Sequence, residues 1–144
     1  MSYSRLIIAT GAEQRVLPET RPLDGVWTLD DSLGLRSALR AAGKVVVVGA
    51  GFIASEIASS ARSLGTEVTI VEAAAVPLVR AVGEPVGEAL AGPHGRNGTR
   101  LICGVQVERI VGDERVQAVG LSSGRWWRPT WWSWELAQCR RRTG

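Results

Sequence analysis

The sequence is poor in the residues that most metal sites and nucleophilic centres use. Its 144 residues hold one histidine and two cysteines, Cys103 and Cys139. Without a C-x-x-C pair, the spacing predicts neither a zinc site nor a thioredoxin-like redox pair. We expect Cys103, in an apolar run, to be a small buried hydrophobe and His94, between glycine and proline residues, to be a solvated loop residue. No catalytic residue and no metal ligand is predicted.

Long hydrophobic runs and a strong charge of one sign are also missing. No stretch approaches the length of a membrane span, and the N-terminus lacks the basic-then-apolar order of a signal peptide. A cytoplasmic protein without membrane contact is therefore expected. The formal charge of +3 comes from the end of the chain, because residues 1–124 hold 12 Lys or Arg against 13 Asp or Glu. This balance predicts no nucleic-acid binding.

The most informative stretch is 44–60, where a run of valines, a glycine-rich turn and a helical pattern follow one another. Four consecutive valines are typical of a strand buried on both faces, as in a parallel sheet. Gly49 permits a sharp turn, Gly51 lets phosphates approach the backbone, and Ala54 is small enough for close helix–strand packing. The positive end of the following helix would face the phosphates. The stretch predicts dinucleotide binding.

An acidic residue supports this interpretation and selects the dinucleotide. A second predicted strand, 67–71, ends in Glu72, which lies 21 residues after Gly51. An acid at this place accepts a hydrogen bond from a ribose 2′-hydroxyl and repels a 2′-phosphate, so NAD(H) is favoured over NADP(H). The alternative is a parallel α/β unit with a glycine turn and no ligand.

The periodicity around this unit predicts an α/β fold, a Rossmann-like parallel sheet with flanking helices and a β-hairpin or meander layer. One helix is expected from Asp30 or Asp31 to about Ala42, with an apolar face made of Leu33, Leu35, Ala38, Leu39 and Ala42. Another is expected from Glu84 to about Leu90, where Gly92-Pro93 stops it. The remaining expectations are a loop over 73–80, a third parallel strand over 100–103, and a hairpin formed by 105–111 and 115–121.

The chain divides into three segments by composition. Residues 1–22 contain one strand-like run and a polar connector, residues 23–124 contain the predicted dinucleotide-binding domain, and residues 125–144 are rich in tryptophan and arginine. Five of the six tryptophans fall within 126–134. Such a cluster could be a stacking platform for bases or a membrane-interface patch, but it has no regular period with polar alternation.

Taken together, the motifs resemble the FAD-dependent pyridine nucleotide-disulfide oxidoreductases, and most of all the NADH-dependent ferredoxin reductases. The resemblance covers about residues 3–124 and is carried by segments 6–12, 28–31, 45–56, 68–80 and 105–121. It implies hydride transfer from NADH to FAD and single-electron delivery to an iron–sulfur partner such as a ferredoxin. The site residues that it implies are Gly49, Gly51, Phe52 and Ile53 for the pyrophosphate, Glu72 for the ribose, Glu56 toward the nicotinamide and flavin, and Thr10 with Gly11 near the FAD.

For Glu56 a second interpretation stays open, in which it is a first-turn acid that interacts with the helix dipole. The sequence also departs from the family. Family members begin with an FAD-binding unit that has its own glycine motif, and here only the segment 6–12 matches that domain. We therefore expect these residues not to retain FAD.

The resemblance suggests an explanation for the tryptophan-rich segment. Tryptophan has the single codon TGG, and adjacent TGG codons read one register over give mostly valine. If Arg125 to Arg140 are written with G/C-rich codons, reading from the third base of codon 125 gives Asp-Leu-Val-Val-Val-Gly, which is similar to the strand that the family has at this place. We therefore predict that 125–144 is an aberrant, out-of-frame tail, with chance as the alternative. A missing strand would leave an open sheet edge beside the tryptophans, which favours self-association.

The function predicted from the sequence is the NAD(H)-binding part of a flavoprotein oxidoreductase of the ferredoxin reductase type, inactive in this form. Two alternatives stay open. One is a stand-alone NAD(H)-binding module without catalysis, and the other is an inert product of a disrupted gene.

Overall fold

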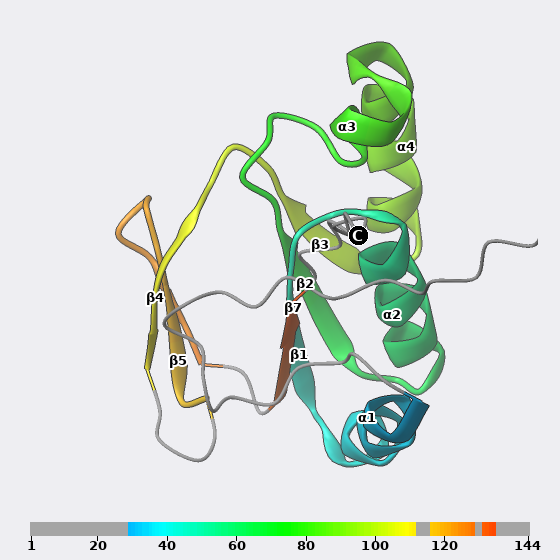
Figure 1. Cartoon of the computed structure of the whole chain (residues 1–144), viewed down its shortest axis with the longest axis vertical. Helices are drawn as coiled ribbons and strands as arrows, with labels where there is room; N and C mark the ends of the chain where they lie inside the picture. Colours follow the sequence, from blue (N-terminus) through cyan, green and yellow to red (C-terminus); the bar gives the residue numbers. More distant parts are fainter. Residues whose placement is uncertain (1–28, 112–115, 129–130, 135–144) are drawn as a thin grey trace, which may run out of the picture.

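A computed structural model describes residues 29–111, 116–128 and 131–134 of the chain. It contains a four-stranded parallel sheet in the order β3-β2-β1-β7 and a three-stranded antiparallel sheet in the order β4-β5-β6. Helices α2 and α4 lie on one side of the parallel sheet, and the β4–β5 hairpin lies on the other (Figure 1). The α/β fold and the Rossmann-like arrangement expected from the sequence are confirmed.

The parallel sheet begins with the elements around the glycine-rich turn. Strands β1 (Lys44–Val48) and β2 (Glu67–Val71) pair in parallel, with Val47 opposite Ile70. Strand β3 (Thr99–Ile102) pairs in parallel with the other edge of β2. All three strands lie within a residue of the predicted ranges, and the apolar runs of β1 and β2 are buried on both faces, as the sequence indicated.

Helix α2 (Phe52–Ser63) covers one face of this sheet, and its buried residues are Ala54, Ile57, Ala58 and Ala61. These are the residues that the helical spacing selected. They form one core with Val45, Val47, Val68 and Ile70. Helix α1 (Leu29–Ala41) adds Leu39 to this core, whereas Leu33, which we expected on its apolar face, is 52% exposed. The helix was therefore predicted correctly, but the width of its buried face was not.

The antiparallel sheet covers the opposite face of the parallel sheet. Strands β4 (Val107–Val111) and β5 (Ala118–Leu121) form the predicted hairpin, and the short β6 (Trp126–Trp127) extends it. A second core joins the two sheets, and it consists of Val46, Val71, Val116, Val119 and Leu121. Because side chains alternate along a strand, β1 and β2 supply both cores.

The structure corrects our expectation of an open edge beside β1. Strand β7 (Trp131–Trp134) pairs in parallel with β1, with Ser133 opposite Val47. This segment has no regular period with polar alternation in the sequence. Bulky aromatic residues nevertheless favour extended backbone, and an unpaired central strand offers a full row of hydrogen-bonding groups. The edge of β1 is therefore occupied by the segment that we expected to leave it open.

Two helices also differ from the expectation. Helix α4 (Glu84–Arg96) continues through Pro93 instead of ending before it, so His94 is helical and not a loop residue. The last turn persists because the Asn97 N–H and Nδ2 both donate to the Pro93 carbonyl, at 3.1 and 2.8 Å. A four-residue helix, α3 (Val79–Val82), interrupts the region that we predicted to be a loop. Burial lowers the pKa of His94.

Helix α4 approaches the 76–77 segment closely at a glycine. A Cβ on Gly87 would lie 2.6 Å from the Pro77 carbonyl oxygen and 2.7 Å from Val76 Cγ2. We expect Gly87→Ala to lower the free energy of unfolding by about 1–3 kcal/mol, because the added methyl group would force the backbone at Pro77 or the side chain of Val76 to move from its position. Denaturant unfolding measures this.

Gly95→Ala is the matched control on the same helix, because a Cβ there meets nothing within 4 Å. It should be stabilising by about 0.5–1 kcal/mol through helix propensity. Equal effects of the two substitutions would contradict the close contact at Gly87.

Candidate functional site

The glycine-rich turn lies at the carboxyl end of β1, where ligands bind in open parallel sheets. Gly49 has a φ of +96°, a left-handed conformation that a side chain would strain. Its N–H donates to the Val71 carbonyl at 2.7 Å, which ties the turn to the end of β2. The glycine at this position therefore has the conformational role that the motif assigns to it.

The amino end of α2 follows the turn directly. Gly51 is the N-cap residue, and it supplies no side-chain cap. The first intrahelical bond joins the Ser55 N–H to the Gly51 carbonyl at 3.1 Å. Ala54 is fully buried against the sheet, so the helix start lies close to the strands. This arrangement directs a positive helix end toward the turn, as an anion site requires.

Glu72 lies directly against the same turn. Its Oε2 accepts a hydrogen bond from the Ala50 N–H at 2.6 Å, and its Oε1 accepts one from the Ala74 N–H at 2.8 Å. Glu72 and Ala50 are 22 residues apart in the sequence, and the parallel pairing of β1 and β2 brings them into contact. The carboxylate is held in a fixed orientation beside the turn. Its role toward a ribose stays a prediction.

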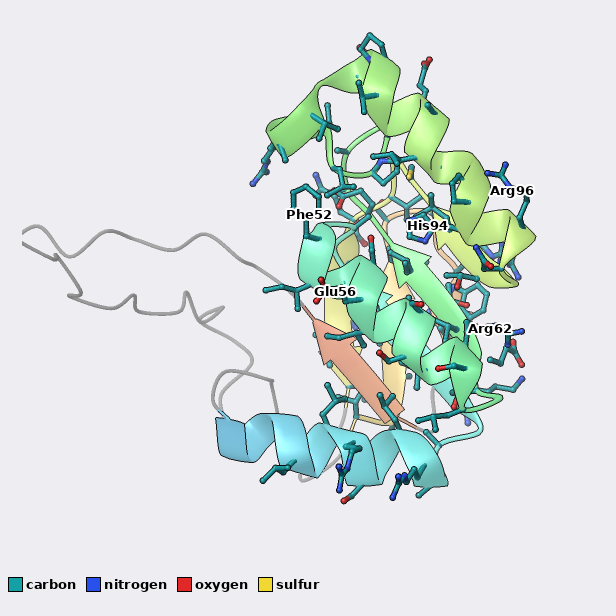
Figure 2. The ribbon with its side chains drawn as sticks, turned by 90° about the vertical axis from the view of Figure 1, so that its right-hand side faces the viewer. Phe52, Glu56, Arg62, His94 and Arg96 are labelled. Atoms are coloured by element: carbon teal, nitrogen blue, oxygen red, sulfur yellow. The ribbon has the colours of Figure 1, made fainter. Side chains whose placement is uncertain are left out.

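The remaining predicted site residues lie on α2 or outside the described residues. Phe52 and Ile53, at the start of α2, are 59% and 49% exposed, and Glu56 is also exposed. Figure 2 shows Phe52 at the amino end of the helix and Glu56 further along it. Helix α2 has no acidic residue in its first turn, so the first-turn interpretation of Glu56 is wrong. Thr10 and Gly11 lie outside the described residues.

Sequence reasoning missed the segment that packs over the turn. The Leu78 N–H donates to the Ala50 carbonyl at 3.0 Å, and Leu78 has a φ of +58°, which is uncommon for a residue with a side chain. Val76 and Pro77 before it are buried. Ala50 is therefore fixed from both sides, by Glu72 at its N–H and by Leu78 at its carbonyl. No local pattern in the sequence indicates this contact.

Cys103 follows β3 and is half-buried, less than expected. Burial, and secondarily the negative charge of Glu72, raise the pKa of its thiol. Since the thiolate is the reactive form, we expect slow alkylation near neutral pH. In a Cys139→Ser background, Glu72→Gln should speed alkylation a few-fold at fixed pH by lowering the thiol pKa. The alkylation rate measured against pH checks this.

Glu67→Gln is the control for this experiment, because it removes the same charge from the other end of β2. It should leave the reactivity of Cys103 unchanged. If Glu67→Gln and Glu72→Gln change the rate equally, Glu72 has no direct influence on the thiol.

None of the described helices is long and apolar enough to cross a membrane. Within the same part of the chain, no three His, Cys, Asp or Glu side chains are grouped as metal ligands would be. The glycine turn, the amino end of α2 and Glu72 together form the candidate site, because Glu72 is hydrogen-bonded to the turn.

Comparisons with known proteins point to one family. Residues 1–126 match the family described as pyridine nucleotide-disulphide oxidoreductase. The ferredoxin–NAD(+) reductase component of the biphenyl dioxygenase system of Paraburkholderia xenovorans is 38% identical over 129 residues, which are 87% of this chain and 32% of that protein. The chain thus spans about a third of the length of the curated relatives that it matches.

Solved structures agree with this match. A ferredoxin reductase from Rhodopseudomonas palustris has a TM-score of 0.80 and 35% identity, over 89% of this chain and 33% of that one. The covalent putidaredoxin reductase–putidaredoxin complex gives a TM-score of 0.81 and 28% identity, over 92% of this chain and 34% of the other. The family match covers most of the chain, and the fold and the glycine turn agree with it. The chain belongs to the pyridine nucleotide-disulphide oxidoreductase family.

Proposed function

We propose that residues 23–124 are the NAD(H)-binding domain of a ferredoxin-reductase-type flavoprotein, in which NADH reduces FAD and an iron–sulfur protein accepts the electrons. The observation that supports this most strongly is the Glu72 carboxylate bonded to the Ala50 N–H within the glycine turn. The names of the relatives, which include ferredoxin reductase components, support the electron acceptor.

The residues of this chain would bind and orient the dinucleotide. The turn at Gly49 and Gly51, with the amino end of α2, would hold the pyrophosphate. The Glu72 carboxylate, already oriented by two backbone N–H groups, would accept a hydrogen bond from the adenosine ribose and repel a 2′-phosphate. Phe52 and Ile53, exposed at the start of α2, would lie at the pyrophosphate, and exposed Glu56 would lie toward the nicotinamide and flavin. FAD, when bound, supplies hydride acceptance and release of single electrons.

In the family arrangement, Thr10 and Gly11 would contact the FAD. We further propose that these 144 residues bind NADH without retaining FAD and without turnover. A stand-alone NAD(H)-binding module would bind the dinucleotide in the same way as a reductase part, and the two differ only in whether an FAD-binding part acts together with this domain. An inert gene product would bind neither cofactor.

A titration of the purified chain with NADH separates a dinucleotide-binding domain from an inert gene product. The proposal expects saturable binding, tighter for NADH than for NADPH, a protein without flavin absorbance, and no diaphorase activity. Addition of FAD should not restore activity. A bound flavin or diaphorase activity would contradict the proposed absence of FAD, and an unfolded circular-dichroism spectrum without an effect of NADH on melting would support the inert product.

We also propose that 125–144 is an out-of-frame tail. The pairing of β7 with β1 supports this, because residues 131–134 lie beside β1 in the place where the shifted frame would supply a valine-rich strand. Resequencing the DNA on both sides of codon 125 tests it. A single-base change that restores the valine strand is the expected result, and a confirmed frame would contradict it.

A further inference from the structure

One peptide group of the glycine turn is held by the segment 76–78. The Leu78 N–H donates to the Ala50 carbonyl at 3.0 Å. Because a trans peptide group is planar, its N–H points opposite to its carbonyl. The Gly51 N–H shares a peptide group with the Ala50 carbonyl, so it points away from this segment. Gly51 is partly exposed, and its N–H donates to no acceptor among the described residues, so a ligand can accept this hydrogen bond.

The composition of the turn makes this contact important. Glycine has more backbone freedom than any other residue, so rotation at Gly51 turns its N–H at little steric cost. The Glu72 carboxylate fixes only the preceding peptide group, through the Ala50 N–H. In the described part of the chain, the bond from Leu78 is the hydrogen bond that holds the peptide group between Ala50 and Gly51.

Leu78 itself has an unusual conformation that its neighbours impose. Its φ of +58° and ψ of +10° are left-handed, and such backbone angles persist only where the surrounding structure determines them. Val76 and Pro77 before it are buried, and a Cβ on Gly87 of α4 would lie within 2.7 Å of each. The Leu78 carbonyl accepts hydrogen bonds from two N–H groups of α3, at 2.8 and 3.0 Å. Helices α3 and α4, which lie together beyond the turn, thus brace the residue that holds it (Figure 1).

We propose that Leu78 is a positioning residue for the dinucleotide, because its N–H fixes the Ala50–Gly51 peptide group with the Gly51 N–H directed to the pyrophosphate. This role rests on the proposed function, which assigns the pyrophosphate to the glycine turn. A donor that is oriented before the ligand arrives strengthens binding, since the turn loses less conformational freedom when the complex forms. The role belongs to the backbone N–H of Leu78 and not to its side chain.

The test removes this N–H from the full chain. Incorporation of leucic acid at Leu78 by nonsense suppression keeps the side chain and turns the amide into an ester, which has no donor. We expect the affinity for ADP to fall about tenfold, because a hydrogen bond to a charged phosphate is weakened. The affinity for adenosine, which has no phosphate, should stay unchanged, whereas a general loosening of the fold would lower both. Nitrogen–proton correlation spectra follow both titrations and report folding.

Two variants are the controls. The corresponding ester at Val76 removes an N–H that has no acceptor in the described ranges, and it should leave both affinities unchanged. Leu78→Gly keeps the N–H and adopts a positive φ without strain, so it should bind ADP like the unaltered chain. In the unaltered chain, ADP should shift the Gly51 N–H signal more than adenosine does, and this measurement needs no variant.

Several outcomes would overturn the role of Leu78. It is wrong if the Leu78 ester binds ADP like the unaltered chain, if it loses ADP and adenosine equally, or if the Val76 ester has the same effect. It is also wrong if Leu78→Gly loses ADP binding, or if ADP leaves the Gly51 signal in place. When the unaltered chain binds NADH, these results concern Leu78 alone. A chain that binds neither NADH nor ADP would overturn the proposed function together with this role.

Discussion

Replacing Glu72 by glutamine is expected to weaken NADH binding by about tenfold and to remove most of the discrimination against NADPH. The carboxylate orients the glycine turn through its bonds to the Ala50 and Ala74 N–H groups. Hydrogen bonds to charged groups contribute about 1.5–3 kcal/mol, whereas an uncharged amide retains only part of this interaction. The substitution also removes the negative charge that repels a 2′-phosphate. Titrations with both dinucleotides at one ionic strength measure the two effects.

Glu67→Gln is the control, because it neutralises an acid at the opposite end of the same strand. Its ion pair with Lys44 is exposed on both sides, so its loss should change neither affinity nor stability by more than about 1 kcal/mol. If Glu72→Gln binds both dinucleotides like the unaltered chain, Glu72 does not contact the ribose, and the proposed site would have to be revised.

The second large effect is expected at β7. Residues 131–134 pair in parallel with 45–48, and successive N–H groups of a strand point to opposite sides. Of the two variants Trp132→Pro and Ser133→Pro, one therefore removes an N–H that faces β1, and the other removes an N–H that faces away. We expect the variant that removes the N–H facing β1 to lower the free energy of unfolding by about 1–3 kcal/mol, because a β1 carbonyl loses its hydrogen-bond partner. The other variant should change this free energy less.

The damaging variant should also self-associate more than the unaltered chain, because it uncovers an edge of a central strand. Denaturant unfolding and size-exclusion chromatography of both variants provide these readouts, and each variant serves as the control for the other. If both prolines are tolerated equally, β7 does not pair with β1, and the edge is open as the sequence alone suggested. Self-association of the unaltered chain stays a prediction.

The sequence by itself determined the central βαβ unit. The valine run, the glycine turn, the four apolar positions of α2 and the second strand are local patterns with a period of two or 3.6 residues. They specify β1, α2 and β2, and they place Glu72 at the carboxyl end of β2, next to the turn. The candidate site could be predicted for the same reason, since parallel strands end at one edge of the sheet.

Only the tertiary structure decided the contacts between segments without such a period. The pairing of β7 with β1, the bond from Leu78 to Ala50 and the nearness of Cys103 to Glu72 each join residues by packing, not by a repeating pattern. In these places tertiary partners outweigh local propensity.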